Sequence, residues 1–215
     1  MKKRILTLLA ATLIPFAGVG KEGDWGSVSD FIVSYNMTPK WFLFSRSQVQ
    51  LNADISTLYL GLIDAGLGYR INANWNVGAA YRRFWVRPRD EWLADNRPLI
   101  DLTWSDTFKQ TKVSNRSRVE FHFYEYDKDD DIRFRNATRV VFPWDIVGIK
   151  PYVDEEFFIS HNAGTLNMNW LGAGLTYKVA DSMSLRLGYR WVTLRLKDHS
   201  WGNRNALTTA LVLTF

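Results

Sequence analysis

The stretch ALTTALVLTF, residues 206–215, closes the chain. Successive side chains of an extended strand point to opposite sides, so one face of this stretch carries Leu207, Thr209, Leu211, Leu213 and Phe215. The same alternation of apolar and polar residues recurs along most of the chain, interrupted by short polar segments. This pattern indicates an all-β protein whose strands each have one apolar face.

The N-terminus has the pattern of a secretion signal. Basic residues at 2–4 precede an apolar run over 5–16, and Gly18 and Gly20 offer small residues before a cleavage point. A membrane-spanning helix needs about 20 apolar residues, and this run is shorter and contains Pro15. We therefore expect a signal peptide over 1–20 and a single domain over 21–215.

Composition excludes several classes of function. The chain has no cysteine, which rules out disulfides, thiol nucleophiles and thiolate metal sites. Three of the basic residues behind the net charge of +5 lie in the predicted signal, so we expect no nucleic-acid partner. Aromatic residues make up 15% of the chain, which is typical of a β-barrel with aromatic girdles at both membrane interfaces.

A repeated spacing marks hairpins. Aromatic or Met residues recur six positions apart across short polar turns, in the pairs Tyr35 and Trp41, Tyr69 and Trp75, and Tyr177 and Met183. Such a unit places two large side chains at one membrane depth beside a tight turn. Hairpins of a soluble β-sandwich are the weaker alternative.

The alternation predicts eleven strands, near 28–36, 41–51, 57–71, 75–86, 99–109, 115–126, 132–142, 149–160, 168–179, 183–197 and 204–215. Short turns around 38, 73, 112, 145 and 181 alternate with longer loops, of which 87–97 is the longest. Bacterial single-chain barrels have an even number of strands. We therefore expect a transmembrane antiparallel β-barrel of about 10–12 strands. Ten is favoured, with 28–36 outside the wall; a divided segment, giving twelve, is the alternative.

The inward faces carry charges. Arginine facing lipid at the midplane costs roughly 2–4 kcal/mol, so alternation assigns the charged face of each strand to the interior. The candidate lumen or anion-binding residues are Arg116, Arg118, Glu120, Arg133, Arg135, Arg139, Asp154, Glu156, Arg186 and Arg190, with Arg46, Asp64, Arg82 and Asp101 elsewhere in the lumen. Asp106 and Glu155 fall on outward faces, which predicts a bulge, a strand end or a shifted register.

Two interpretations of this interior stay open. Arginine–carboxylate pairs across neighbouring strands stabilise a barrel wall. Arginines in excess of carboxylates attract anions, because the guanidinium presents a rigid fork suited to carboxylate or phosphate. The two roles are compatible with each other.

Several motifs together resemble a known family. They are Arg116-x-Arg118-x-Glu120, the repeated Gly-Tyr-Arg at 68–70 and 188–190, Trp41 after the first turn, and the acidic-aromatic strand over 152–158. The set resembles an uncharacterised family of small Gram-negative outer-membrane β-barrel proteins, a domain of unknown function. The resemblance covers nearly all of residues 21–215 and implies fold and location, but no activity or ligand.

An enzyme is the least favoured class. Lipid hydrolases of the outer membrane place His two residues before Ser on one strand, and His122, His161 and His199 do not. A triad assembled from separate strands stays open. The acidic run over 127–131 lacks the glycine and final glutamate of a calcium loop, so a solvated loop is favoured. We expect no cofactor.

The predicted location is the outer membrane of a Gram-negative bacterium. Expected partners are outer-membrane lipid and lipopolysaccharide, and the barrel-assembly machinery, which reads a last strand ending in an aromatic residue such as Phe215. Three hypotheses remain: a narrow channel or binding site for small anionic solutes, a sealed structural or adhesive barrel, and a lipid-modifying enzyme.

Overall fold

The structure, a computed structural model, describes residues 25–88, 91–145, 147–162, 164–196 and 200–215. It has eleven strands: β1 (Trp25–Asn36), β2 (Trp41–Asn52), β3 (Thr57–Arg70), β4 (Trp75–Val86), β5 (Leu93–Phe108), β6 (Thr111–Tyr124), β7 (Asp131–Val141), β8 (Ile149–Ser160), β9 (Thr165–Ala180), β10 (Met183–Arg195) and β11 (Trp201–Thr214). Each predicted segment corresponds to one of them. The predicted signal over 1–20 lies outside the described ranges and stays a prediction.

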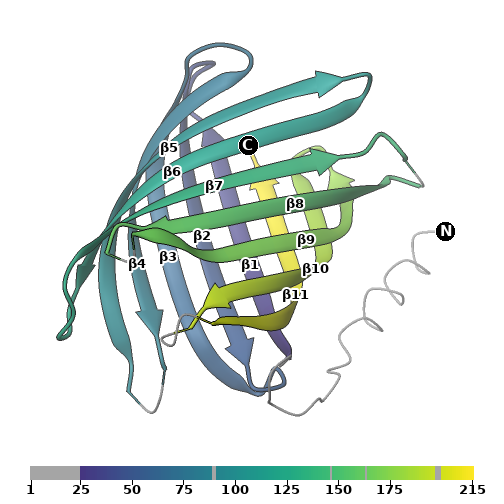
Figure 1. Cartoon of the computed structure of the whole chain (residues 1–215). Helices are drawn as coiled ribbons and strands as arrows, with labels where there is room; N and C mark the ends of the chain where they lie inside the picture. The colour runs from purple at the N-terminus through teal and green to yellow at the C-terminus, as the bar shows by residue number, and fades with distance from the viewer. Residues whose placement is uncertain (1–24, 89–90, 146, 163, 197–199) are drawn as a thin grey trace.

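The strands form one closed barrel in chain order (Figure 1). Every consecutive pair is antiparallel, and an odd number of strands then forces one parallel pair. That pair is β1 with β11, in register from Trp25 opposite Asn205 to Ser34 opposite Thr214. The backbone N–H and the side-chain amide of Asn36 both donate to the carbonyl oxygen of Phe215, each at 2.8 Å. The expectation of ten strands, with the first segment outside the wall, is therefore wrong.

The barrel has two different ends. We call the end with the connections 37–40, 71–74, 109–110, 142–148 and 181–182 the turn end, and Phe215 also lies there. The loop end has the connections 53–56, 87–92, 125–130, 161–164 and 196–200, and β1 begins there. The predicted long loop over 87–97 is shorter than expected because β5 already begins at Leu93. The connection over 142–148 is longer than any at the loop end, contrary to the predicted asymmetry.

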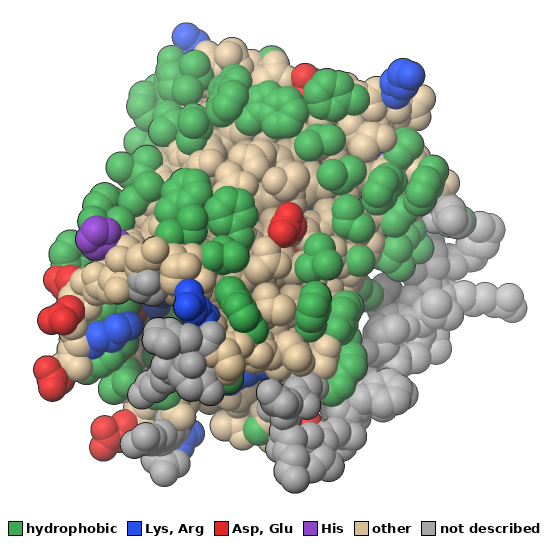
Figure 2. Space-filling model, in the orientation of Figure 1, with side chains coloured by type: hydrophobic (Ala, Val, Ile, Leu, Met, Phe, Trp, Pro, Cys, Tyr) green, Lys and Arg blue, Asp and Glu red, His purple; other side chains and the backbone are tan. Residues whose placement is uncertain are grey.

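The outer wall is apolar. Large exposed side chains include Phe31, Ile63, Ile100, Leu171 and Leu187, each more than a third exposed. Figure 2 shows such side chains over the wall of the barrel, with most charged groups gathered near its ends. An apolar wall around a closed sheet is the fold of a transmembrane β-barrel. No helix within the described residues is long and apolar enough to cross a membrane.

Glycines let aromatic rings fill part of the turn-end half. A Cβ at Gly68 on β3 would meet the ring of Phe42, and a Cβ at Gly66 would meet Phe44 at 2.7 Å. On the opposite side of the barrel, a Cβ at Gly188 would meet the Tyr152 hydroxyl at 2.5 Å. The glycine of each Gly-Tyr-Arg repeat therefore makes room for a ring from another strand, which narrows the interior.

Candidate functional site

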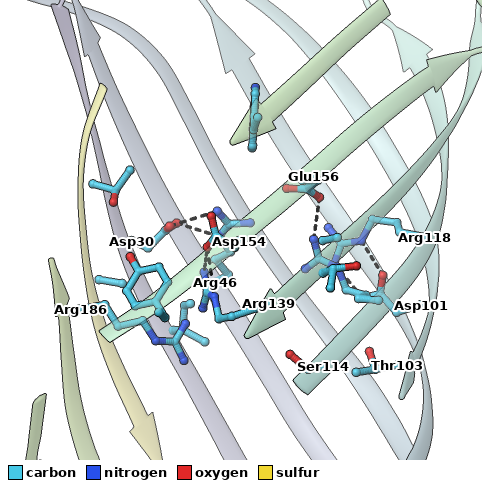
Figure 3. A pocket seen from close by; sticks show the side chains of 18 of the residues that line it. Asp30, Arg46, Asp101, Thr103, Ser114, Arg118, Arg139, Asp154, Glu156 and Arg186 are labelled. Atoms are coloured by element: carbon cyan, nitrogen blue, oxygen red, sulfur yellow. Dashed lines mark hydrogen bonds and ion pairs between the residues drawn. The ribbon is translucent and has the colours of Figure 1, made fainter. Parts of the chain in front are cut away.

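All ten candidate residues lie inside the barrel. Alternation along β6, β7, β8 and β10 places them there, and their outward neighbours are mainly apolar. Arg118, Glu120 and Arg135 are buried, and Glu120 is 0% exposed. Figure 3 shows Arg118 and Glu156 projecting inward from the β6 and β8 side of the interior, and Arg186 across from them.

A central cluster of six charged residues lies on the β3–β7 side of the interior, midway along the barrel. Its members are Asp64, Arg82, Asp101, Arg118, Glu120 and Arg135. Glu120 accepts hydrogen bonds from Arg82 at 2.9 Å and from Arg135 at 2.7 Å. Arg82 also donates to Asp64 at 2.6 and 3.0 Å, and Arg118 donates to Asp101 at 2.5 and 2.7 Å. Each buried charge in this cluster therefore has a counterion, as its burial requires.

Strand register explains two of these pairs. Asp64 lies opposite Arg82 in the β3–β4 ladder, and Asp101 lies opposite Arg118 in the β5–β6 ladder. The bond from Arg82 on β4 to Glu120 on β6 instead passes over β5. Such a bond depends on how far an arginine side chain reaches inside the curved wall, which alternation does not reveal.

A second group of ion pairs lies beside the central cluster. Glu156 on β8 accepts from Arg116 and from Arg135, each at 2.8 Å. Arg139 donates to Asp154 in the adjacent strand. On the other side of the barrel, Arg46 donates to Asp30 at 2.7 and 3.1 Å. Figure 3 shows the pairs Arg46 with Asp30, Arg139 with Asp154 and Arg118 with Asp101 around the turn-end chamber.

Three of the candidate arginines have no carboxylate partner among the described residues: Arg133, Arg186 and Arg190. The Nε atom of Arg133 and the Nη1 atom of Arg190 are buried without any hydrogen-bond partner. The guanidinium of Arg190 lies 4.5 Å from the centre of the Trp170 ring. Pairing thus neutralises most of the interior charge and leaves these three arginines without an ion-paired carboxylate in the part of the chain that the structure describes.

Two cavities occupy the interior, one on each side of the central cluster. The turn-end chamber, of about 320 Å³, is lined by ion-paired residues and by Thr103, Ser114 and Arg186. The loop-end chamber, of about 390 Å³, is lined by Arg97, Arg133 and many apolar side chains. Arg46, Trp170 and Arg190 line both chambers, and we call these three residues the waist.

The connection over 125–130 lies beside the rim of the loop-end chamber. Hydrogen bonds from Arg83 and Asn96 lower the pKa of Glu125 to about 2. Burial raises the pKa of Tyr126 to about 12, so its phenol is neutral at pH 7. Burial also lowers the pKa of Lys128, whose ammonium lies 3.9 Å from the centre of the Tyr124 ring.

The two exceptional carboxylates differ. Asp106 lies close to the end of β5, as one of the predicted explanations requires. Glu155 lies near the middle of β8, faces outward and pairs in regular register with Thr138 and Leu171. A bulge, a strand end and a shifted register are therefore all wrong for Glu155. The side-chain amide of Asn169 donates to it at 3.0 Å.

The histidines form no catalytic pair with serine in the described residues. His122 is 0% exposed, and its Nε2 lies 3.4 Å from Glu120, so it belongs to the interior network. His161 is exposed, whereas Ser160 is buried and donates to Asp131 at 2.6 Å. His199 lies outside the described residues. Within the described ranges, no three His, Cys, Asp or Glu side chains are placed to hold a metal ion.

Sequence reasoning missed several interior charges, among them Asp30, Asp95 and Arg97. Asp30 was overlooked because the first segment was placed outside the wall. Asp95 and Arg97 were overlooked because 87–97 was interpreted as a loop; they pair with each other at 2.5 and 2.7 Å. Continuing the alternation upstream from Asp101 on β5 would have placed all of its odd-numbered charges inside.

Comparisons with known proteins agree with this geometry. The chain resembles a solved structure described as "NanC porin structure in rhombohedral crystal form", with a TM-score of 0.55 and 12% identity over 88% of this chain and 97% of that chain. At this identity the likeness concerns the fold alone. No curated protein matches the chain. A family model matches residues 25–203, and the chain therefore belongs to the family described as "Protein of unknown function (DUF2490)".

Proposed function

We propose that this protein is an outer-membrane β-barrel that binds small anionic solutes and lets them pass through its waist. The apolar outer wall and the porin-like fold support a membrane location. A last strand that ends at an aromatic residue supports insertion by the assembly machinery of the Gram-negative outer membrane. Lipopolysaccharide is then the lipid that surrounds the loop end.

The observation that carries this proposal is the set of three arginines without counterions. Arg133 lines the loop-end chamber, Arg186 lines the turn-end chamber, and Arg190 lines both. An unpaired buried guanidinium is costly unless an anion or water accompanies it. Arg133, Arg186 and Arg190 are half-buried in the same interior and together form a sequence of anion sites. Selectivity in narrow pores arises from such rings or rows of charge.

We expect the waist to limit the rate at which anions pass from one chamber to the other. Arg46 is held there by Asp30, and Trp170 stacks against Arg190. An anion that leaves Arg133 reaches Arg190 before it reaches Arg186. Weak binding at several sites favours passage over trapping, because each site must release the ion it has bound.

The test is conductance of the refolded protein in a planar lipid bilayer. We expect discrete current steps that are selective for anions over cations. Replacing Arg190→Gln should lower the anion-to-cation permeability ratio on the order of fivefold, the effect of one unit charge at contact distance in water. The matched control is Arg83→Gln, which removes an outward-facing arginine at the loop end and should leave the ratio unchanged.

Cation selectivity, or equal ratios for the Arg190 and Arg83 variants, would contradict the proposal. Silence from folded, heat-modifiable protein would instead support the second candidate, a sealed structural barrel. That candidate is favoured by one observation, the central cluster, whose side chains are 11% exposed or less. Under it, the arginines act only in stabilising the wall.

A further inference from the structure

The loop-end chamber has an apolar lining that a purely polar pore does not need. Most of its inward-facing apolar residues come from two pairs of neighbouring strands: Leu60, Leu62, Phe84 and Val86 from β3 and β4, and Met168, Trp170, Val192 and Leu194 from β9 and β10. Val28, Phe158 and Ala206 add apolar surface from β1, β8 and β11. These strand pairs lie across the interior from each other, since β5–β8 separate them on one side and β11, β1 and β2 on the other. The interior of a barrel that carries hydrophilic solutes is polar instead.

The wall between these apolar surfaces is cationic. Arg97 and Arg133 face the chamber from β5 and β7. Arg97 is held by Asp95 and lies 3.5 Å from the centre of the Phe84 ring. Arg135, the next inward residue on β7, is saturated by Glu120 and Glu156.

Arg133 is the group on this wall that can take a ligand. It has no carboxylate partner among the described residues, and its buried Nε has no hydrogen-bond partner. It lies within electrostatic reach of Arg97, Glu120 and Arg135, so two cations and one carboxylate surround it. In the β7–β8 ladder it faces Ser160, whose hydroxyl already donates to Asp131. A bound anion beside Arg133 would relieve repulsion among three arginines.

We propose that the loop-end chamber binds an amphipathic organic anion, with its carboxylate on Arg133 and its aliphatic or aromatic body against the apolar strands. This inference rests on the proposed function and names the class of solute that enters it. A chamber of about 390 Å³ is within the usual size range of small-molecule sites. Such sites combine mostly apolar walls with a few placed polar groups, as this chamber does.

The turn-end chamber differs from the loop-end chamber in the polarity of its lining. Asp30, Thr103, Ser114 and Asp154 line it, and Arg186 is the unpaired arginine that lines this chamber and not the other. It offers an anion charge and hydrogen bonds, and it has fewer apolar side chains than the loop-end chamber, chiefly Ile32, Phe44 and Tyr152. The amphipathic site therefore belongs to one end of the barrel and is not a general property of the interior.

The experiment is calorimetric titration of the refolded barrel, transferred from detergent into amphipol, with octanoate. Butyrate keeps the carboxylate but has a shorter chain, so it tests the contribution of the apolar body. Octylammonium keeps the chain but carries a positive charge, so it tests the need for an anion. Each buried methylene contributes about 0.8 kcal/mol, so octanoate should bind at least about tenfold more tightly than butyrate. Octylammonium should not compete with octanoate.

Two variants locate the site. Arg133→Gln should weaken octanoate binding on the order of tenfold, the usual loss of one charged hydrogen bond, and Arg133→Lys should restore part of the affinity. Leu62→Ser should reduce the preference for octanoate over butyrate. Arg70→Gln is the control, because Arg70 lies at the turn end, away from the loop-end chamber, and donates to Asn36 and Pro39 there. Heat-modifiable migration verifies that each variant is folded.

The outcomes separate this inference from the proposed function. Equal affinity for octanoate and butyrate, competition by octylammonium, or equal loss in the Arg133 and Arg70 variants would overturn the amphipathic site even if the barrel conducts anions. Octanoate binding that depends on Arg133, in a barrel without conductance, would keep the site and overturn passage. Both readouts use the same refolded chain.

Discussion

The two chambers share one wall but differ in chemistry. The inward face of β3 shows how this arises: it carries Leu60 and Leu62 beside the loop-end chamber, Asp64 in the central cluster, and Gly66 and Gly68 under the rings that narrow the turn-end half. Alternation decides only which side chains point inward. The order of residue types along that inward face then decides where the barrel is apolar, charged or narrow.

The central cluster is what keeps the chambers apart. Glu120 binds Arg82 and Arg135 and lies 3.5 Å from Arg118, so three arginines share this one carboxylate. Among the substitutions below, removal of this shared counterion should therefore disturb the separation of the two chambers most.

The largest effect is expected for Glu120→Gln. The variant leaves buried arginines without a shared counterion, and breaking a buried ion pair in this way costs about 3–5 kcal/mol. The measurement is the free energy of unfolding from urea titration in lipid vesicles, followed by tryptophan fluorescence. Glu125→Gln, at an exposed carboxylate outside the strands, is the control. A loss below about 1 kcal/mol would mean that the arginines relax into the chambers.

A smaller effect is expected for Gly68→Ala, which tests how tightly aromatic rings fill the turn-end half of the interior. The new Cβ meets the ring of Phe42, and overpacking of this kind costs about 1–3 kcal/mol of unfolding free energy. The same substitution at Gly61 on the same strand is the control, because its Cβ would make only ordinary contact with Trp85 at 3.9 Å. Equal stability of the two variants would show that Phe42 moves without cost.

Arg186→Gln tests whether the two chambers act on different classes of anion. It removes the unpaired arginine that lines only the turn-end chamber, so passage of small hydrophilic anions should fall by roughly fivefold. Octanoate affinity should change far less than in Arg133→Gln, since Arg186 does not line the loop-end chamber. Conductance with chloride and titration with octanoate measure the two effects. If both variants weaken octanoate binding alike, the chambers are not chemically distinct.

The smallest effect concerns the loop-end rim. The pKa of Glu125 is lowered from 4.5 to about 2 by hydrogen bonds from Arg83 and Asn96. The stability that this contact adds is present above the unfolded-state pKa and is lost as the pH falls from 4.5 towards 2. The difference in unfolding free energy between the native chain and Glu125→Gln should shrink over that range. Because the carboxylate is fully exposed, added salt should also reduce the difference.

Much of the fold could be predicted because side chains alternate between the inside and the outside of the barrel along every strand. Each of the eleven strands follows from alternation, and each of the ten candidate residues lies inside. The first residues of β5 were not predicted as strand for a physical reason. Pro98 has no backbone N–H to donate, so proline is typical of loops and strand ends. In the structure it pairs with Tyr81 on β4, and the β5–β6 ladder is interrupted at residues 97 and 98.

Ion pairing could not be predicted to the same degree. Arg116 reaches Glu156 and Arg82 reaches Glu120 across an intervening strand. The sequence indicates only that both members face inward. Which arginines remain unpaired depends on the curvature of the wall and on the length of each side chain, so Arg133, Arg186 and Arg190 could not be separated from the other candidates beforehand.

The parallel seam between β1 and β11 has a consequence for chain connectivity. β1 starts at the loop end and Phe215 lies at the turn end, so a circular permutant would need a linker as long as the 12-residue β1, about 40 Å at the usual rise per residue. In an even-stranded barrel a tight turn would suffice. Adding or deleting whole hairpins changes the number of strands by two, so no such series of duplications connects this barrel to an even-stranded ancestor; that step requires a single strand.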